Sequence, residues 1–413
     1  MQGKDTIKST FDQLFEAVTS FTQNLKDREV DKYVKKFTAL KFILLMSFAQ
    51  LNQLKSLRDI SNHLNDEQLA EAIALSEISA SQISRKQRSE LLEVIKALFY
   101  DVIHQAGIKQ GFNQVREKLG KLLVIDSTVI SLCLSQYRWA NFRETKSGVK
   151  VHLRLRLSNE SVLPDAAVIT AARKADRTQM DDLVTEDPDA FFVFDRAYVD
   201  YDKFDCYCDQ SIRFASRLKA SALVEVKEEF PVDSGSAIIK DSRVVLGKKG
   251  LNQMKNALRV IETTDSEGKS IKIVTNDLTL SAQEIGDIYR NRWQIEIFFK
   301  WIKQHLFIKH FYGTGEQAVE LQLYIALITY CLLTLLKQKT GYQGSLLNLK
   351  RCISVSLYEP FPSFVRKLYG KGKRQSRGRR TIDHEKIYQE TLRQVISGEA
   401  DHLNDLTYDP VIL

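Results

Sequence analysis

The sequence predicts an α/β protein in which helices flank a mixed sheet with a β-rich insertion, preceded by an all-α N-terminal domain. Three observations support this fold class. The first 115 residues contain no proline and repeat apolar side chains at three- and four-residue spacing. From Lys121 onward the apolar pattern changes to that of strands, and a capped helix carrying an acid begins near Ser281.

The composition is that of a mildly basic protein of 413 residues, long enough for two or three domains with cores of their own. Its net charge of +8 and sequence pI near 9.0 make a polyanion a suitable partner. The five cysteines show no Cys-x-x-Cys or Cys/His ligand spacing, so we expect neither a zinc site nor disulfides. Together with a polar N-terminus, this predicts a cytoplasmic protein.

Within the N-terminal region, the segment Ser79–Phe99 has the pattern of a turn leading into a helix with a basic N-terminal end. Such a pattern fits a helix-turn-helix DNA reader, and it fits an amphipathic packing helix about as well. A second segment, Val319–Leu336, approaches the length of a membrane span but carries Glu320, Gln322 and Thr329. We interpret it as a buried core helix, with a membrane span as the alternative.

Two apolar, strand-like runs each end in an aspartate. Residues 122–125 (LLVI) precede Asp126, and residues 191–194 (FFVF) precede Asp195. Taken singly, each aspartate also fits a turn or cap residue where the chain leaves a sheet. The elements predicted between and after these runs are strands at 149–157, 164–172 and 211–220, and a helix at 176–185.

This order of strands and helices is that of a ribonuclease-H-like domain. In such a domain the first and fourth strands run side by side, so Asp126 and Asp195 are expected to be neighbours. After the fifth strand, residues 222–278 contain four short strand patterns that the core fold does not need, and we interpret them as a β-rich insertion.

The stretch from Ser281 to His310 carries a third acid. Ser281 and Glu284 form a capping box, and the absence of Pro and Gly after Asp287 predicts that the helix continues to His310. Beside its apolar stripe, one face gathers Tyr289, Arg292, Glu296, Lys300 and Lys303. The plain alternative is that Arg292 and Glu296 form an ordinary surface pair at i, i+4 spacing.

Three carboxylates that converge repel one another unless a cation lies between them. Convergence of Asp126, Asp195 and Glu296 therefore predicts bound divalent metal, with two Mg²⁺ ions sharing Asp126 and Mn²⁺ as a substitute. Two such ions activate an attacking hydroxyl and stabilise the leaving oxygen of a phosphodiester. The cations near Glu296 would then bind phosphates, and so would the basic run Arg366–Arg380, unless that run is only a solvated, flexible segment.

The spacing Tyr289, Arg292, Glu296 and Lys303 resembles the Y-(2)-R-(3)-E-(6)-K signature of DDE transposases of the insertion-sequence-four family. The motifs IDST at Asp126, GVKVHLRL around His152 and FDRAY at Asp195 are similar to that family too, so the resemblance covers about residues 115–340.

The resemblance implies a bacterial insertion-sequence transposase that binds terminal inverted repeats, cleaves DNA and transfers the strand, with Asp126, Asp195 and Glu296 as catalytic, metal-binding triad. It also implies a homodimer on double-stranded DNA, associated with the nucleoid. The expected DNA-binding residues are Tyr289, Arg292, Trp293, Lys300, Lys303, His152, Lys219 and Arg196, with Trp293 stacking on an unpaired base.

The domains expected on this basis are a helical DNA-binding domain (1–115), the first part of the catalytic core (116–221), the insertion (222–278), the second part of the core (279–340) and a helical, basic C-terminal region (341–413). Two other functions remain open: a stand-alone ribonuclease-H-like DNA nuclease, and a non-catalytic, domesticated DNA-binding protein. The presence of all three acids speaks against the second.

Overall fold

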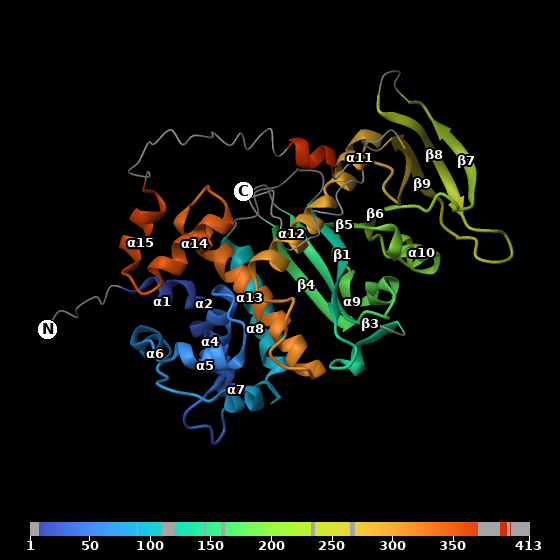
Figure 1. The fold of residues 1–413 in the computed structure, drawn as a ribbon. Helices are drawn as coiled ribbons and strands as arrows, with labels where there is room; N and C mark the ends of the chain where they lie inside the picture. Colours follow the sequence, from blue (N-terminus) through green and yellow to red (C-terminus); the bar gives the residue numbers. More distant parts are fainter. Residues whose placement is uncertain are drawn as a thin grey trace.

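The computed structural model describes residues 8–88, 90–109, 120–143, 146–157, 162–232, 236–264, 269–370, 389–394 and 397. Figure 1 shows a helical part packed beside one large sheet, with the last strands of that sheet projecting from the opposite side. The basic run predicted at Arg366–Arg380 lies mostly outside the described residues.

The N-terminal region is entirely helical in its described residues, as predicted. Its longer helices start at residues that satisfy free backbone N–H groups: the Thr38 side chain accepts from the N–H of Lys41, and Ser79 forms a capping box with Gln82. The helices are α1 (Thr10–Leu14), α2 (Glu16–Ser20), α3 (Thr22–Asp27), α4 (Ala39–Leu51), α5 (Leu57–His63), α6 (Glu67–Ile73), α7 (Ala80–Gln87) and α8 (Leu92–Lys109).

The core sheet has the strand order that the sequence predicted. β1 (Lys121–Leu132) pairs antiparallel with β3 (Lys146–Leu157) and parallel with β5 (Ala190–Phe194). β3 pairs antiparallel with β4 (Val162–Ala171), and β5 pairs parallel with β6 (Arg213–Arg217). This pairing is ribonuclease-H-like and confirms the fold class. Shorter elements around these strands are η1 (Arg138–Ala140), β2 (Asn141–Arg143), η2 (Asp176–Gln179), α9 (Met180–Leu183), η3 (Arg196–Tyr198) and α10 (Tyr201–Asp209).

The β-rich insertion is continuous with the core sheet. All four strand patterns fold as strands, and the last of them pairs antiparallel with β6, so that the described residues form one ten-stranded sheet. Buried Arg259 supports the insertion by binding both carboxylate oxygens of Asp241, at 2.9 and 2.6 Å. The four strands are β7 (Val224–Phe230), β8 (Ile238–Leu246), β9 (Leu258–Thr264) and β10 (Ser270–Thr275).

The helix predicted from Ser281 to His310 is in fact two helices, α11 (Ala282–Arg290) and α12 (Trp293–His305). The predicted capping box at Ser281 is present. Between the helices, the N–H groups of Asn291, Arg292, Gln294 and Ile295 donate to carbonyls three residues back rather than four. The chain is therefore more tightly wound here, which turns Glu296 relative to Tyr289 and makes the straight helical projection wrong at this point. The second helix also ends five residues earlier than predicted, where Leu306 becomes extended.

The apolar segment predicted as a core helix is buried, as expected. It forms α13 (Glu316–Thr340), the one helix in the described part of the chain that is long and apolar enough to cross a membrane, and 94% of its apolar window is buried. Two of its polar side chains bond within the protein: Gln322 donates to the Phe307 and His310 carbonyls, and the Tyr324 hydroxyl donates to the Ala167 carbonyl in β4. Helices α14 (Leu346–Ser356) and α15 (Phe361–Leu368) follow it.

The N-terminal helices share a core with the catalytic half through α13, which packs against α4 and α8. Helix α8 is therefore a packing helix, with Ile95, Leu98 and Val102 fully buried. A second link lies just beyond α12, where the amide side chain of Gln50 both donates to and accepts from the backbone of Phe307, at 3.2 and 2.8 Å. The helix that carries Glu296 is thus anchored at its end to the N-terminal domain.

Candidate active site

Asp126 and Asp195 lie on neighbouring strands, at the point where the parallel pairing of β1 with β5 stops. The sequence predicted a strand that ends in Asp126, but β1 continues to Leu132 along β3, whereas Asp195 directly follows β5. The parallel pairing of β1 with β5 sets Ile125 opposite Phe194, so Asp126 and Asp195 follow at equivalent positions on adjacent strands. Because Val124 and Ile125 pack on opposite faces of the sheet, Asp126 projects to the face covered by α12, and Ser127 to the other. Asp195 precedes η3 and is half-buried.

Arg292 joins the first and third acids. Its Nη1 atom lies 3.0 Å from Oδ2 of Asp126, and its Nη2 atom lies 2.7 Å from Oε1 of Glu296. The Arg292–Glu296 contact is the i, i+4 pair that the sequence suggested, but Arg292 reaches across to the sheet as well. The structure therefore brings Asp126 and Glu296 to opposite ends of one guanidinium, which is more than an ordinary surface pair.

The surroundings of Asp126 disfavour its charge. Burial raises the pKa of its carboxyl to about 7, and the negative charges of Asp195 and Glu296 act in the same direction. The guanidinium of Arg292 and the backbone N–H of Ser127 lower the pKa but do not outweigh burial. A carboxylate whose charged form is disfavoured in this way is stabilised by a nearby cation.

The donor set of the site fits a hard divalent cation, because all three acids offer carboxylate oxygen. Among the described residues, no three side chains of the ligand types are yet gathered tightly enough to hold an ion. The guanidinium that separates Asp126 from Glu296 accounts for this spacing. Asp126, Asp195 and Glu296 would hold a metal ion once Arg292 moved from between the two acids that it joins.

The other residues of the predicted signature lie around this centre. Tyr289 is buried at 8% exposure, and burial raises the pKa of its hydroxyl to about 12. The Lys303 ammonium donates to Oγ1 of Thr128 at 2.6 Å and to the Val129 carbonyl at 3.2 Å, and burial lowers its pKa to about 8. Lys303 therefore ties α12 to β1 just beyond Asp126. Lys300, one turn after Glu296, is half-buried.

An exposed apolar pair lies beside Glu296 on α12. Trp293 and Ile297 are 38% and 48% exposed, and their i, i+4 spacing places them on one side of the helix. The sequence analysis singled out Trp293 and missed Ile297. Ile297 could have been recognised from the sequence, because it lies outside the apolar stripe of its own helix.

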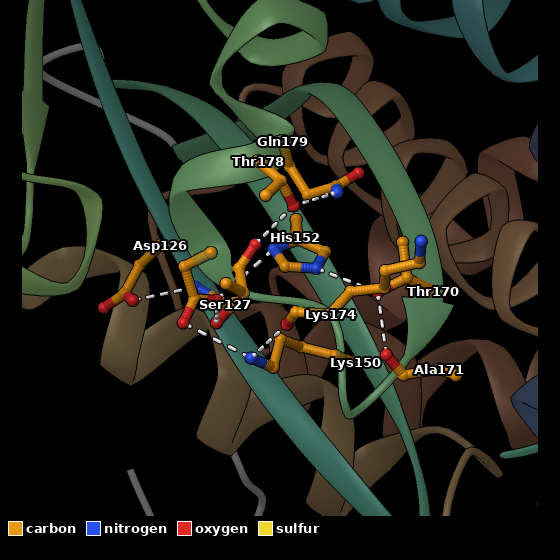
Figure 2. Close-up of polar contacts among 11 residues, drawn as sticks. Asp126, Ser127, Lys150, His152, Thr170, Ala171, Lys174, Thr178 and Gln179 are labelled. Carbon is orange, nitrogen blue, oxygen red and sulfur yellow. Dashed lines mark hydrogen bonds and ion pairs between the residues drawn. The ribbon is translucent and has the colours of Figure 1, made fainter. Parts of the chain in front are cut away.

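His152 does not lie with these residues, which corrects the expectation that it contacts DNA. Its side chain has no exposed surface, and it pairs in register with Ser127, on the face of the sheet opposite the Asp126 carboxylate. Figure 2 shows Asp126 pointing away from the cluster of Ser127, Lys150 and His152. A strand that alternates apolar and polar residues does not reveal by itself that its polar face is also covered.

Arg196 and Lys219 are exposed and follow β5 and β6, at the same edge of the sheet as Asp195. The loop after β4 adds the exposed cations Arg173, Lys174 and Arg177, which the sequence analysis missed although they form a short basic run. A cavity of about 480 Å³ lies at this edge. Its lining includes the cations Arg177 and Lys219 and the acids Asp200 and Asp202. The exposed cations of this edge, rather than the cavity, make it suited to a chain of phosphates.

A ribonuclease-H-like sheet with one acid within its first strand, a second directly after the neighbouring parallel strand, and a third on a facing helix defines a class of enzymes that process nucleic acids. Comparison with known proteins identifies the family. Residues 117–332 match the family described as Transposase DDE domain, and residues 6–72 match a domain of unknown function, DUF4372. The first match covers more than half of the chain.

Two proteins named as transposases are similar to the chain in sequence. The chain is 30% identical over 338 residues to "Probable transposase for insertion sequence element IS5377" of Geobacillus stearothermophilus, covering 81% of this chain and 82% of that protein. It is 32% identical over 225 residues to "Putative transposase y4zB" of Sinorhizobium fredii (strain NBRC 101917 / NGR234), covering 53% and 61% of the two chains. A solved structure of piggyBac transposase in a synaptic complex with hairpin DNA is similar at a TM-score of 0.44 and 9% identity, over 91% of this chain and 86% of that one.

The chain therefore belongs to the DDE transposases of insertion sequences. It is an enzyme that binds DNA, cleaves it and transfers the cleaved strand, and it depends on divalent metal.

Proposed function

We propose that this transposase recognises the terminal inverted repeats of its own insertion sequence and moves the element by cut-and-paste, with Asp126, Asp195 and Glu296 as catalytic residues. The observation that carries the assignment is the bridge from Asp126 through Arg292 to Glu296, beside a strand that ends in Asp195. The bridge joins two acids from distant parts of the chain, and this supports the proposed grouping of all three.

The metal is proposed to be Mg²⁺, as two ions, with Mn²⁺ able to substitute. Bound by the three carboxylates, the metal supplies activation of the attacking hydroxyl and stabilisation of the leaving oxygen. The protein itself holds two of the acids on neighbouring strands and the third on α12. Arg292 has a second role, because it can pair with a DNA phosphate when it leaves the carboxylates.

The proposed DNA contacts follow the exposed face around the acids. Lys300 and Lys303 bind the phosphates that flank the scissile bond, and Trp293 stacks on an unpaired base. Tyr289 was expected to contact DNA as well, but it is buried, and we propose that it acts through its neighbour Arg292. Ile297 extends the apolar surface of Trp293 by one turn of helix. Arg196 and Lys219 contact the DNA backbone farther along the sheet edge.

The larger assignments are also proposals. The helical domain (1–115) would bind the element ends, residues 116–221 and 279–340 would form the catalytic core around the insertion (222–278), and residues 341–413 would add a basic arm. Helix α7, with exposed Arg85 and Arg88 near its end, is the DNA-facing candidate of the first domain, because α8 is buried. We place the protein in the cytoplasm, as a homodimer on DNA, because two element ends must be paired.

One assay tests the function against its rivals. The protein is incubated with Mg²⁺ and a DNA that carries candidate terminal inverted repeats taken from the sequence flanking its gene. We expect cleavage at the repeat ends, followed by joining of the freed 3′ end to a target. Nicking without regard to the ends would favour a stand-alone nuclease, and end binding without cleavage would favour a non-catalytic regulator.

A further inference from the structure

We propose that Asp176 is a positioning residue for the catalytic centre: through Ser127 it fixes the middle of β1, from which Asp126 projects. This inference rests on the proposed role of Asp126 in metal binding. Asp176 belongs to no motif recognised in the sequence, and it reaches the site from the loop after β4.

The link between the two carboxylates passes through one serine. The backbone N–H of Ser127 donates to Oδ1 of Asp126 at 2.7 Å, and the hydroxyl of the same serine donates to Oδ1 of Asp176 at 2.5 Å. Successive side chains of a strand point to opposite faces. The Ser127 hydroxyl therefore binds Asp176 on one face, while the Ser127 backbone N–H binds the Asp126 carboxylate, which projects to the other. A rotation of this peptide would disturb both bonds.

Asp176 is itself held by two side chains of β3, Lys150 and His152. The Lys150 ammonium lies 3.3 Å from its Oδ2 and also donates to the Lys174 carbonyl at 3.0 Å. His152 places Nδ1 3.5 Å from Oδ1 of Asp176, and its Nε2 lies 3.1 Å from the hydroxyl of Thr170 in β4. The side chains of Lys150 and Asp176 are only 11% and 18% exposed, so the pair is largely shielded from water.

The loop that carries Asp176 is closed locally. The hydroxyl of Thr178 donates to the Ala175 carbonyl at 2.7 Å, and the backbone N–H of Thr178 donates to the same oxygen at 3.1 Å. Burial lowers the pKa of His152 to about 4, so at neutral pH the imidazole is uncharged and Lys150 supplies the positive charge opposite Asp176. The network is thus a closed set of one carboxylate, one ammonium and neutral partners.

Such a network affects the metal through the position of Asp126. Partners that orient a ligand from behind are worth about 10- to 100-fold in metal affinity. A shift of about 1 Å at a reacting centre can cost about 100-fold in rate. Removing Asp176 leaves the Ser127 hydroxyl without this acceptor and the Lys150 ammonium with only the Lys174 carbonyl. The Ser127 peptide within β1 is then held less firmly.

The test measures binding of Mn²⁺ alone to the full-length protein by electron paramagnetic resonance, without DNA and without turnover. We expect Asp176→Ala and Ser127→Ala to raise the Kd for Mn²⁺ by at least about 10-fold, and Asp176→Asn, which keeps an acceptor oxygen, to have a smaller effect. Ser127→Thr keeps the hydroxyl and should restore affinity close to that of the wild type. Asp181→Ala is the matched control, since it removes an exposed acid from the neighbouring helix α9.

Binding of DNA ends in EDTA separates positioning from folding, and it should be the same in all these variants. Mn²⁺ affinity that is unchanged in Asp176→Ala, or lost equally in Ser127→Ala and Ser127→Thr, overturns the positioning role. Asp126→Ala distinguishes failure of the positioning role from failure of the proposed function. If Asp126→Ala abolishes Mn²⁺ binding and Asp176→Ala does not, only the positioning role is wrong; if the wild type binds no Mn²⁺, both are wrong.

Discussion

Asp126 and Asp176 are two carboxylates on opposite faces of β1, and their surroundings differ in charge balance. On the face covered by α12, Asp126 shares the single guanidinium of Arg292 with Glu296, and Asp195 is near enough to raise the pKa of Asp126. On the other face, Asp176 forms an ion pair with the ammonium of Lys150 and accepts a hydrogen bond from the Ser127 hydroxyl.

This difference in charge balance indicates which face of β1 takes part in the reaction. Three acids with one shared arginine leave an excess of negative charge that a divalent cation can neutralise. The Asp176 face is balanced and largely buried, so it gains nothing from a further ion. We conclude that the first face is the reacting one and that the second supports it, and the following experiments can break or sharpen this contrast.

The largest effect is expected from the acids themselves. Asp126→Asn and Glu296→Gln should each lower DNA cleavage by at least about a thousand-fold, because the metal contributes several kcal/mol of transition-state stabilisation. Binding of inverted-repeat ends, measured by mobility shift in EDTA, should stay near the wild-type level. Equal loss of cleavage and binding would instead mean that these acids serve the fold.

Arg292→Ala should lower cleavage by about 100-fold, because it removes a phosphate contact and leaves two carboxylates facing each other. Arg292→Lys should recover little of this rate, since an ammonium cannot hold two acids as a planar guanidinium does. In the absence of DNA, Mg²⁺ should raise the Tm of Arg292→Ala more than that of the wild type. A smaller rise would argue that Arg292 does not occupy the space between the acids.

His152→Ala tests the supporting face. The change should lower the free energy of unfolding by about 2 kcal/mol, because it leaves a small cavity and removes the contact between the imidazole and the Thr170 hydroxyl. Urea unfolding measures this loss. After correction for the unfolded fraction, the affinity for DNA ends should be unaltered, and a specific loss of end binding would restore the expectation that His152 contacts DNA.

The pH dependence of stability provides a smaller test of the reacting face. The pKa of Asp126 is about 7 in the folded protein and near 3.8 when unperturbed, so between these values the folded state keeps a proton that the unfolded state has lost. Metal-free protein should therefore lose stability as pH rises from about 4 to about 7. Asp126→Asn should reduce the slope of the free energy of unfolding against pH by an amount on the order of 1 kcal/mol per pH unit. Thermal unfolding across this pH range measures the slope.

The smallest effect is expected at the sheet edge. Lys219→Ala should weaken binding of all DNA sequences alike and reduce the slope of log affinity against log salt concentration by about 1, because one phosphate contact is lost. Binding titrations at several salt concentrations provide the slope. A change in sequence preference would show that Lys219 reads bases.

Much of the fold was predictable because it depends on local patterns. The apolar runs before Asp126 and Asp195, the capping box at Ser281 and the four strand patterns of the insertion all appear where expected. The pattern could not show the tighter winding at Asn291, because the residues there are compatible with a continuous helix. It also could not show that β10 would pair with β6, since pairing is a choice among distant partners.

By itself, the sequence determined the strand order, the two acids on neighbouring strands and the spacing of the residues around Glu296, but not that β1 continues past Asp126 to Leu132. Only the tertiary structure decided which of these charges meet. Arg292 reaches Asp126 across 166 residues and Asp176 reaches Ser127 across 49, and His152 is buried although its strand alternates. Side-chain periodicity reports which way a residue points from its own element, whereas its charge state and partners depend on what the rest of the chain packs against it.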